Sequence, residues 1–384
     1  MRGFRLNSRA HSRGRTLWVF AACFGLGLLL GGCGARHPAK PVTEEPVLNI
    51  YNWAEYIGHH TIEEFEQQTH IKVVYAFYDS NEMLETALLA GTSGYDIVST
   101  TTAFYGRQIQ AKAYLPLDKS KLPKWQYLDP AVLAIQARVD PGNRYAVPYL
   151  HAMNGFAYNV DMIKARMPNA PTDSLAMIFD PKVIAKFADC GVTFLDSPAD
   201  VIQLALAYLH RDPNSARIED LNAAEHVIMA VRPYIRQFDS DDYWHQLAAK
   251  ETCLAVGWSS DYSAAVLRAR EDGTGAHLRF TLPKEGSNIT YNALLIPASA
   301  PHPEAAHKFL NFILEPKVIA EITNDIYYGN DNLAARPFVN ADILNDAAIY
   351  PPSEVRARLY LPLELGPDYD RLRTRAWTRI KTGQ

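Results

Sequence analysis

The sequence predicts an α/β protein built as two lobes that close like a clamp over a ligand cleft. Strand and helix signals alternate along most of the chain, which is typical of parallel, doubly wound sheets. About 340 residues follow the N-terminal leader, and this length favours two domains over a single compact core. A tryptophan–carboxylate motif also occurs twice, each time directly after an apolar strand.

The first lobe is predicted from a regular βαβαβ rhythm. Residues 47–51, 71–77 and 95–99 are apolar and rich in β-branched or aromatic side chains, which favours strands. Residues 61–64 form a capping-box pattern at the start of one helix, and residues 81–90 carry apolar side chains at helical spacing before Gly91. This order implies a parallel sheet.

The second lobe is expected to start after an extended crossing over residues 145–149. Strands are predicted over residues 155–160, 191–195 and 252–257, and helices over residues 200–209, 220–231 and 262–271. Extended segments at 279–284 and 291–296 and a helix over 303–314 return the chain to the first lobe. We expect lobe 1 to contain residues 47–149 and 276–320, and lobe 2 residues 150–275 and 321–384. The cleft then lies at the strand ends, between hinged lobes.

The N-terminus predicts export and a lipid anchor. Residues 1–32 carry five arginines, no acid and an apolar run from Leu17 to Leu30, which is typical of a signal peptide. The run is short for a membrane span. It ends in Leu30-Gly31-Gly32-Cys33, which resembles a bacterial lipoprotein cleavage box, so Cys33 is expected to take the lipid. An ordinary secretory peptide cut elsewhere is the alternative. Residues 33–46 form a polar, proline-containing tether, and the mature protein is expected in the periplasm.

Charge argues against nucleic acid as a partner. Removing the five leader arginines from 38 basic residues leaves 33, against 42 acidic residues. A net acidic chain does not fit a phosphate backbone. It is consistent with a cationic ligand, although bulk charge describes steering more than a site.

Two cysteines remain in the mature chain besides the predicted anchor. Cys190 and Cys253 would face an oxidising compartment, so a disulfide is the simple expectation, and two buried free thiols are the alternative. Their separation has no metal-ligand spacing.

Enzyme and cofactor motifs are incomplete. Gly257-Trp258-Ser259-Ser260-Asp261 lacks the closing glycine of a nucleophile elbow, and Gly273-Thr274-Gly275 lacks the third glycine of a dinucleotide fingerprint. The histidines show no ligand spacing. We therefore expect no catalytic residues, no metal and no cofactor.

The two tryptophan–carboxylate motifs instead favour an organic cation. Trp53, Glu55 and Tyr56 follow the first strand, and Trp258 and Asp261 follow the strand over residues 252–257. Aromatic faces attract cations and carboxylates pair with them. The alternative is a pair of buried tryptophan anchors near solvated acids.

Several ordered motifs resemble one protein family from residue 47 to the C-terminus. They include Asn52-Trp53-Ala54-Glu55-Tyr56-Ile57, Gly94-Tyr95-Asp96-Ile97-Val98, Cys190-Gly191-Val192-Thr193-Phe194-Leu195-Asp196 and Arg373-Thr374-Arg375-Ala376-Trp377. The chain resembles polyamine-binding proteins of bacterial ABC importers, and among them the putrescine-specific group. The resemblance implies a type II periplasmic binding protein, no catalysis, a disulfide between Cys190 and Cys253, and an ABC permease in the inner membrane as partner. We expect a monomer.

The resemblance also implies a ligand-binding set, position by position. It comprises Trp53, Glu55, Tyr56, Thr101, Asp200, Trp258, Asp261, Thr290, Asn292 and Tyr328. Ala54 lacks the hydroxyl usual at its position. The putrescine binders place an aromatic residue and an aspartate where this chain has Thr290 and Asn292.

These departures bear on ligand identity. Binding a diamine removes two ammonium groups from water, which is costly unless each meets an anion. Asn292 offers one acceptor but no charge. The first hypothesis is therefore a receptor for putrescine or a related polyamine. The second keeps the fold for another small amine or an amino acid, and the third is a sensor module.

Overall fold

The structure, a computed structural model, describes residues 46–54, 56–78, 81–91 and 93–383. The predicted signal peptide, most of the tether, the predicted anchor Cys33 and the site residue Glu55 lie outside this part of the chain. No helix in the described part is long and apolar enough to span a membrane.

A parallel βαβαβ unit opens the described chain, as predicted. Strand β1 (Val47–Trp53) pairs in parallel with β2 (Lys72–Tyr78) and with β3 (Ile97–Thr101). Helices α1 (Thr61–Thr69) and α2 (Asn81–Leu89) connect them. Burial alternates along β1, so Leu48 and Ile50 enter the core. The predicted capping box does not form, because His60 is the N-cap of α1 and makes no side-chain cap.

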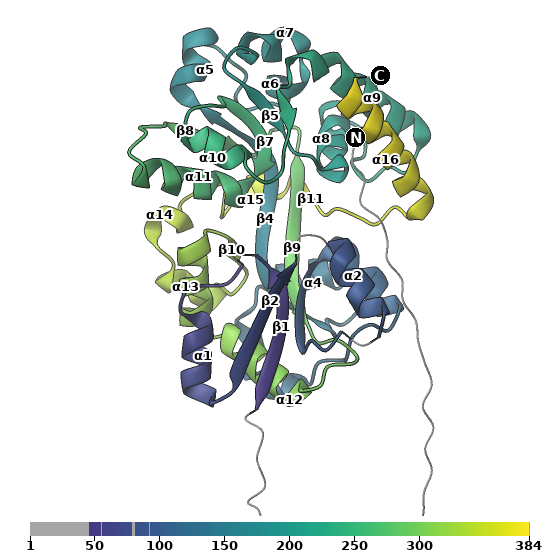
Figure 1. The fold of residues 1–384 in the computed structure, drawn as a ribbon, viewed down its shortest axis with the longest axis vertical. Helices are drawn as coiled ribbons and strands as arrows, with labels where there is room; N and C mark the ends of the chain where they lie inside the picture. The colour runs from purple at the N-terminus through teal and green to yellow at the C-terminus, as the bar shows by residue number, and fades with distance from the viewer. Residues whose placement is uncertain (1–45, 55, 79–80, 92, 384) are drawn as a thin grey trace, which may run out of the picture. The chain divides into compact units, whose positions relative to one another are not determined.

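Two long strands continue the sheet. Strand β4 (Ala146–Asn159) pairs antiparallel with β9 (Ser287–Leu295) along its first part and with β7 (Leu254–Trp258) and β8 (Leu278–Thr281) along its second part. Figure 1 shows β4 and β9 side by side. Residues 146–149 and 155–159, expected to lie in separate elements, thus belong to one continuous strand.

The second α/β unit repeats the parallel arrangement. Strand β5 (Val192–Phe194) pairs in parallel with β6 (Gln237–Phe238) and β7. Helices α8 (Pro198–Tyr208), α9 (Ile218–Val231), α10 (Tyr243–Ala248) and α11 (Ser259–Glu271) belong to this unit. Cys190 and Cys253 form a disulfide just before β5 and β7, which confirms the expected pairing.

Separate hydrophobic cores define the two lobes. One contains β5, β7, α8, α9 and part of the last helix, α16 (Pro367–Thr382). Another contains β1, α1, α12 (Pro303–Ile313) and α13 (Pro316–Ile326). The core packing differs from the predicted lobe boundaries in two segments. Ile322, Ile343 and Ile349 are buried in the first-lobe core, and Leu278 of β8 is buried in the second-lobe core.

The remaining elements are short or peripheral. They are α3 (Thr102–Gln110), α4 (Pro130–Gln136), α5 (Val160–Arg166), α6 (Ala176–Phe179), α7 (Pro181–Ile184), α14 (Ala341–Leu344), α15 (Ser353–Arg356), β10 (Gly329–Asn330) and β11 (Leu359–Tyr360). The last of these pairs in parallel with β9.

Candidate ligand-binding site

The first-lobe part of the site is a group of packed aromatic rings after β1. Trp53 ends β1, and its ring centroid lies 4.5 Å from that of Tyr78. Tyr56 is 4% exposed, and its ring lies 4.6 Å from Tyr328 and 5.6 Å from Tyr149. Burial raises the pKa of the Tyr56 hydroxyl well above its usual value, so the hydroxyl stays neutral. This group offers apolar faces together with neutral hydroxyls.

Two polar atoms in this group are buried without a hydrogen bond to the described residues. They are the Trp53 indole Nε1 and the Tyr56 hydroxyl. An unpaired buried polar group costs about 1–3 kcal/mol, so such atoms commonly mark a bound water or ligand.

The second-lobe part is organised by Tyr243 on α10. Its hydroxyl accepts a hydrogen bond from the Trp258 backbone N–H at 2.9 Å and donates to Asp261 Oδ2 at 2.9 Å. Asp261 lies in the first turn of α11, and its Oδ1 accepts from the Ser260 hydroxyl at 3.2 Å. Trp258 and Asp261 are therefore held by one tyrosine that the sequence analysis did not identify.

Gly257 makes this arrangement possible. A Cβ atom at position 257 would lie 2.3 Å from the Tyr243 hydroxyl oxygen, closer than any real contact. Glycine in a strand commonly marks such a close approach. This glycine was the one signal in the sequence for a neighbour packed against the Trp258 motif.

The environment of Asp261 disfavours the ionised form of its carboxylate. Burial raises its pKa to about 6, and the hydrogen bonds from Tyr243 and Ser260 oppose that rise. The pKa of Tyr328 is also raised, first by burial and then by the negative charge of Asp261. Asp261 therefore lies close to Tyr328, and Tyr328 packs against Tyr56, so Tyr328 lies between one residue of each predicted motif. A cation bound beside Asp261 would compensate its buried charge.

The structure pairs two other predicted residues. Thr101 at the end of β3 is opposite Asn292 on β9, and Asn292 is 7% exposed. Thr290 lies two residues earlier on β9, opposite Ala152 of β4. Thr101, Thr290 and Asn292 thus make this edge of the site polar but uncharged.

Asp200 lies in the first turn of α8, and its carboxylate accepts hydrogen bonds from its own lobe and from β9. Ser197 Oγ donates to its Oδ2 at 2.7 Å, and Asn288 Nδ2 donates to its Oδ1 at 3.0 Å. No hydrogen bond joins Asp200 to the residues around Asp261 in the described chain.

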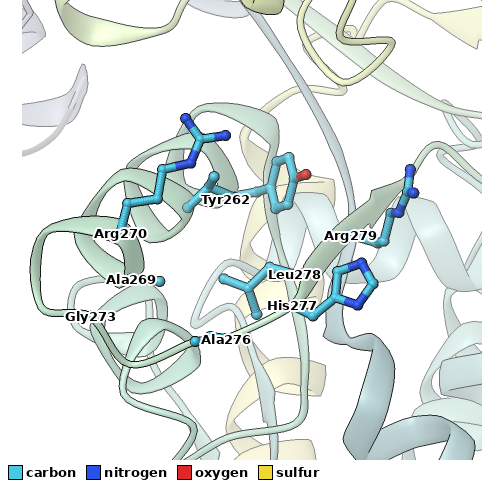
Figure 2. Close-up of a pocket in the computed structure, with 10 residues that line it drawn as sticks. Tyr262, Ala269, Arg270, Gly273, Ala276, His277, Leu278 and Arg279 are labelled. Atoms are coloured by element: carbon cyan, nitrogen blue, oxygen red, sulfur yellow. The ribbon is translucent and has the colours of Figure 1, made fainter.

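A cavity of about 610 Å³ lies elsewhere, between α11 and β8. Arg270, His277 and Arg279 line it, and Figure 2 shows the two arginines on either side of Tyr262. None of the predicted site residues lines this cavity. Its basic lining would repel an ammonium group, so we do not assign it to an amine. The described residues also contain no cluster of three or more His, Cys, Asp or Glu suited to a metal ion.

Comparisons with known proteins agree with this fold. The family model described as bacterial extracellular solute-binding protein matches residues 60–349. The chain is 42% identical to the putrescine-binding periplasmic protein PotF of Escherichia coli K12, over 93% of this chain and 97% of that protein. It is also 42% identical to the putrescine-binding periplasmic protein SpuD of Pseudomonas aeruginosa, over 89% and 93% of the two chains.

A solved structure supports the architecture. The spermidine/putrescine substrate-binding protein PotD of Streptococcus pneumoniae superposes with a TM-score of 0.77 at 23% identity, covering 88% of this chain and 99% of that one. At that identity the likeness speaks for the fold alone. The predicted two-lobed α/β clamp is thus confirmed, and the chain belongs to the family of bacterial extracellular solute-binding proteins.

Proposed function

We propose that this protein captures putrescine or a related polyamine in the periplasm and delivers it to an ABC importer. The observation that carries the proposal is the partly buried Asp261 carboxylate, which accepts from the Tyr243 hydroxyl and lies close to Tyr328, whose ring packs against Tyr56. A primary ammonium group supplies the missing charge, and the rings pack against the methylene chain. The names of its relatives point to the same ligand class.

The proposed ligand-binding set is the one expected from the sequence. Asp261 would pair with one ammonium group, Trp53 and Trp258 would cover the methylene chain, and Tyr56 and Tyr328 would close the site between the lobes. The remaining members are Glu55, Thr101, Asp200, Thr290 and Asn292. The protein is proposed to act as a monomer, anchored to a membrane through lipid on Cys33, and to catalyse no reaction.

Calorimetry on ligand-stripped protein tests the proposal. Putrescine, cadaverine, spermidine, agmatine and γ-aminobutyrate are titrated separately. We expect at least one polyamine to bind, and we expect Asp261→Asn and Trp258→Ala to abolish that binding. Asp272→Asn is the matched control, because Asp272 lies at the opposite end of α11 and pairs with Arg268. Binding of γ-aminobutyrate with no binding of any polyamine would refute the proposal in favour of an amino acid receptor.

A further inference from the structure

The cavity between α11 and β8 belongs to the second lobe and lies outside the proposed amine site. Its volume of about 610 Å³ falls within the roughly 300–1,000 Å³ that small-molecule sites occupy. Arg270 from α11, Arg279 from β8 and His277 just before β8 line it. Among the described residues that line it there is no aspartate or glutamate. The wall of this cavity is therefore basic.

The two arginines of the cavity have no ion-pair partner in the described part of the chain. Both side chains are exposed, and no described carboxylate lies within ion-pair distance of either. Arg268, two residues before Arg270, is by contrast paired with Asp272 at 2.8 Å. Burial raises the pKa of Asp346, and the charge of Arg279 opposes that rise without forming an ion pair. Two guanidinium groups thus remain available to an external anion.

Two further basic groups stand at the rim of the cavity. His277 Nδ1 lies 3.7 Å from Asp161 Oδ1, which is a long contact between two exposed side chains. Lys250 is exposed, and its Nζ would lie 4.0 Å from a Cβ atom placed on Gly275. Grouped cations of this kind raise the local concentration of anions, an effect that salt screens.

Tyr262 lies between the two arginine side chains, as Figure 2 shows. Burial and then the charge of Asp346 raise the pKa of its hydroxyl to about 12, so the hydroxyl stays protonated at neutral pH. The Tyr262 ring, Val266 and Leu278 add apolar surface to the lining. The cavity therefore combines two separate cationic groups with an apolar surface between them.

This arrangement matches a molecule with two separated anionic groups. Each guanidinium group presents a planar fork of N–H donors that fits a carboxylate in bidentate geometry. A carbon chain between two carboxylates would pack against the Tyr262 ring and Leu278. A phosphate ion concentrates its charge on one centre, so it would engage only one of the two arginines and leave the apolar surface uncovered.

We propose that this cavity binds a small organic dicarboxylate, with one carboxylate on Arg270, the other on Arg279 and the carbon chain against Tyr262. The site is separate from the amine site, because none of the residues of the proposed ligand-binding set lines it. One helix serves both sites, since α11 carries Asp261 in its first turn and Arg270 in its last turn. The inference goes beyond the proposed function and does not depend on it.

Calorimetry at constant ionic strength tests the site on ligand-stripped protein. Succinate, glutarate and adipate are titrated, with butyrate and hexanoate as monocarboxylates of matched length and inorganic phosphate as the compact anion. We expect at least one dicarboxylate to bind roughly fivefold more tightly than the monocarboxylate of its length, which is the gain from one further exposed ion pair. It should also bind more tightly than phosphate.

Substitution of each arginine locates the binding. Arg270→Gln and Arg279→Gln should each lower the dicarboxylate affinity roughly fivefold, and the double variant should lose the preference for a dicarboxylate. Arg375→Gln is the matched control, because Arg375 on α16 is also exposed and without an ion pair among the described residues. It removes the same charge from the same lobe and should leave the affinity unchanged. Circular dichroism melting checks that all variants keep the native fold.

Three results would overturn the inference. They are the absence of dicarboxylate binding to the native chain, equal affinities for succinate and butyrate and for adipate and hexanoate, and a loss in Arg375→Gln as large as that in Arg270→Gln. The last result would mean that general charge attraction, and not this cavity, holds the anion. None of these results bears on the proposed polyamine function, which uses other residues.

Discussion

The Tyr243 hydroxyl donates to Asp261 Oδ2 at 2.9 Å while accepting from the Trp258 backbone N–H at the same distance. One phenol thus fixes both the aromatic and the anionic member of the second motif. Its own pKa is raised, first by burial and then by the charge of Asp261, so it remains a hydrogen-bond donor at every pH at which the protein is used.

Removing that hydroxyl should weaken ligand binding without unfolding the protein. Tyr243→Phe keeps the buried ring but deprives Asp261 of one donor, so its ionised form becomes less favourable. We expect affinity for the polyamine to fall by roughly tenfold at pH 7.5 in calorimetry. Tyr234→Phe in the same lobe serves as the control. An unchanged affinity in Tyr243→Phe would mean that Asp261 does not depend on this hydrogen bond.

Ligand affinity should depend on pH through Asp261. Its pKa in the free protein is about 6, and an ammonium ligand binds the ionised carboxylate. Affinity should therefore be nearly constant above pH 7 and should fall as pH decreases through 6, approaching tenfold per pH unit. Titrations at pH 5.0 and 7.5 measure this difference. A profile that is flat between these values would exclude Asp261 as the ammonium partner.

The same carboxylate should reduce the stability of the ligand-free protein. Because burial raises the Asp261 pKa above its unfolded value, the folded state binds more protons between about pH 4 and 6. The contribution of Asp261 to the free energy of unfolding therefore decreases as pH rises through that window, and it stays low above it.

Replacing the acid should recover this stability. Asp261→Asn retains an acceptor for Tyr243 but has no charge to bury. Its free energy of unfolding at pH 7.5 should exceed that of the native chain by roughly 1–3 kcal/mol, with little difference at pH 4. Urea denaturation of both proteins at the two pH values measures this. Equal destabilisation by the substitution at both values would contradict the assignment.

Reduction of the disulfide should destabilise the second lobe. Cys190 and Cys253 are 63 residues apart and join the segments before β5 and β7. The chain-entropy model values such a closure at about 4 kcal/mol, so melting should shift downward in reducing agent. The double variant Cys190→Ser/Cys253→Ser should melt at the reduced temperature with or without reductant. Two free thiols in mass analysis of the untreated protein would disprove the bond.

Sequence patterns predicted the elements that obey simple periodicity. Strands β1 to β3 and helices α8, α9 and α11 lie within a few residues of their predicted ranges. The continuity of β4 was not predicted, because Pro148 and Gly155 normally interrupt strands. Pro148 lies where the β4–β9 register shifts. A Cβ at Gly155 would lie 2.2 Å from the Thr281 carbonyl oxygen, so glycine there allows β8 to approach.

The site was predictable only in part, for a related reason. Trp258 and Asp261 are separated by only two residues in the sequence, at the end of a strand, so their position there could be inferred. Tyr243 comes from another helix, and its contact depends on the packing of α10 on α11. Thr101 and Asn292 are opposite each other through the pairing of two strands about 190 residues apart, which no local periodicity encodes.

The single strand β4 also sets the spacing between residues of the two strands that pair with it. Ala152 is opposite Thr290 of β9, and Asn154, two residues later, is opposite Trp258 of β7. Two peptide units of one chain thus set the spacing between residues of two different lobes. Inserting or deleting one residue there would invert the facing of every side chain on one side of the change. Length variation in this protein should therefore be confined to loops, whereas the span between Ala152 and Asn154 keeps a constant length.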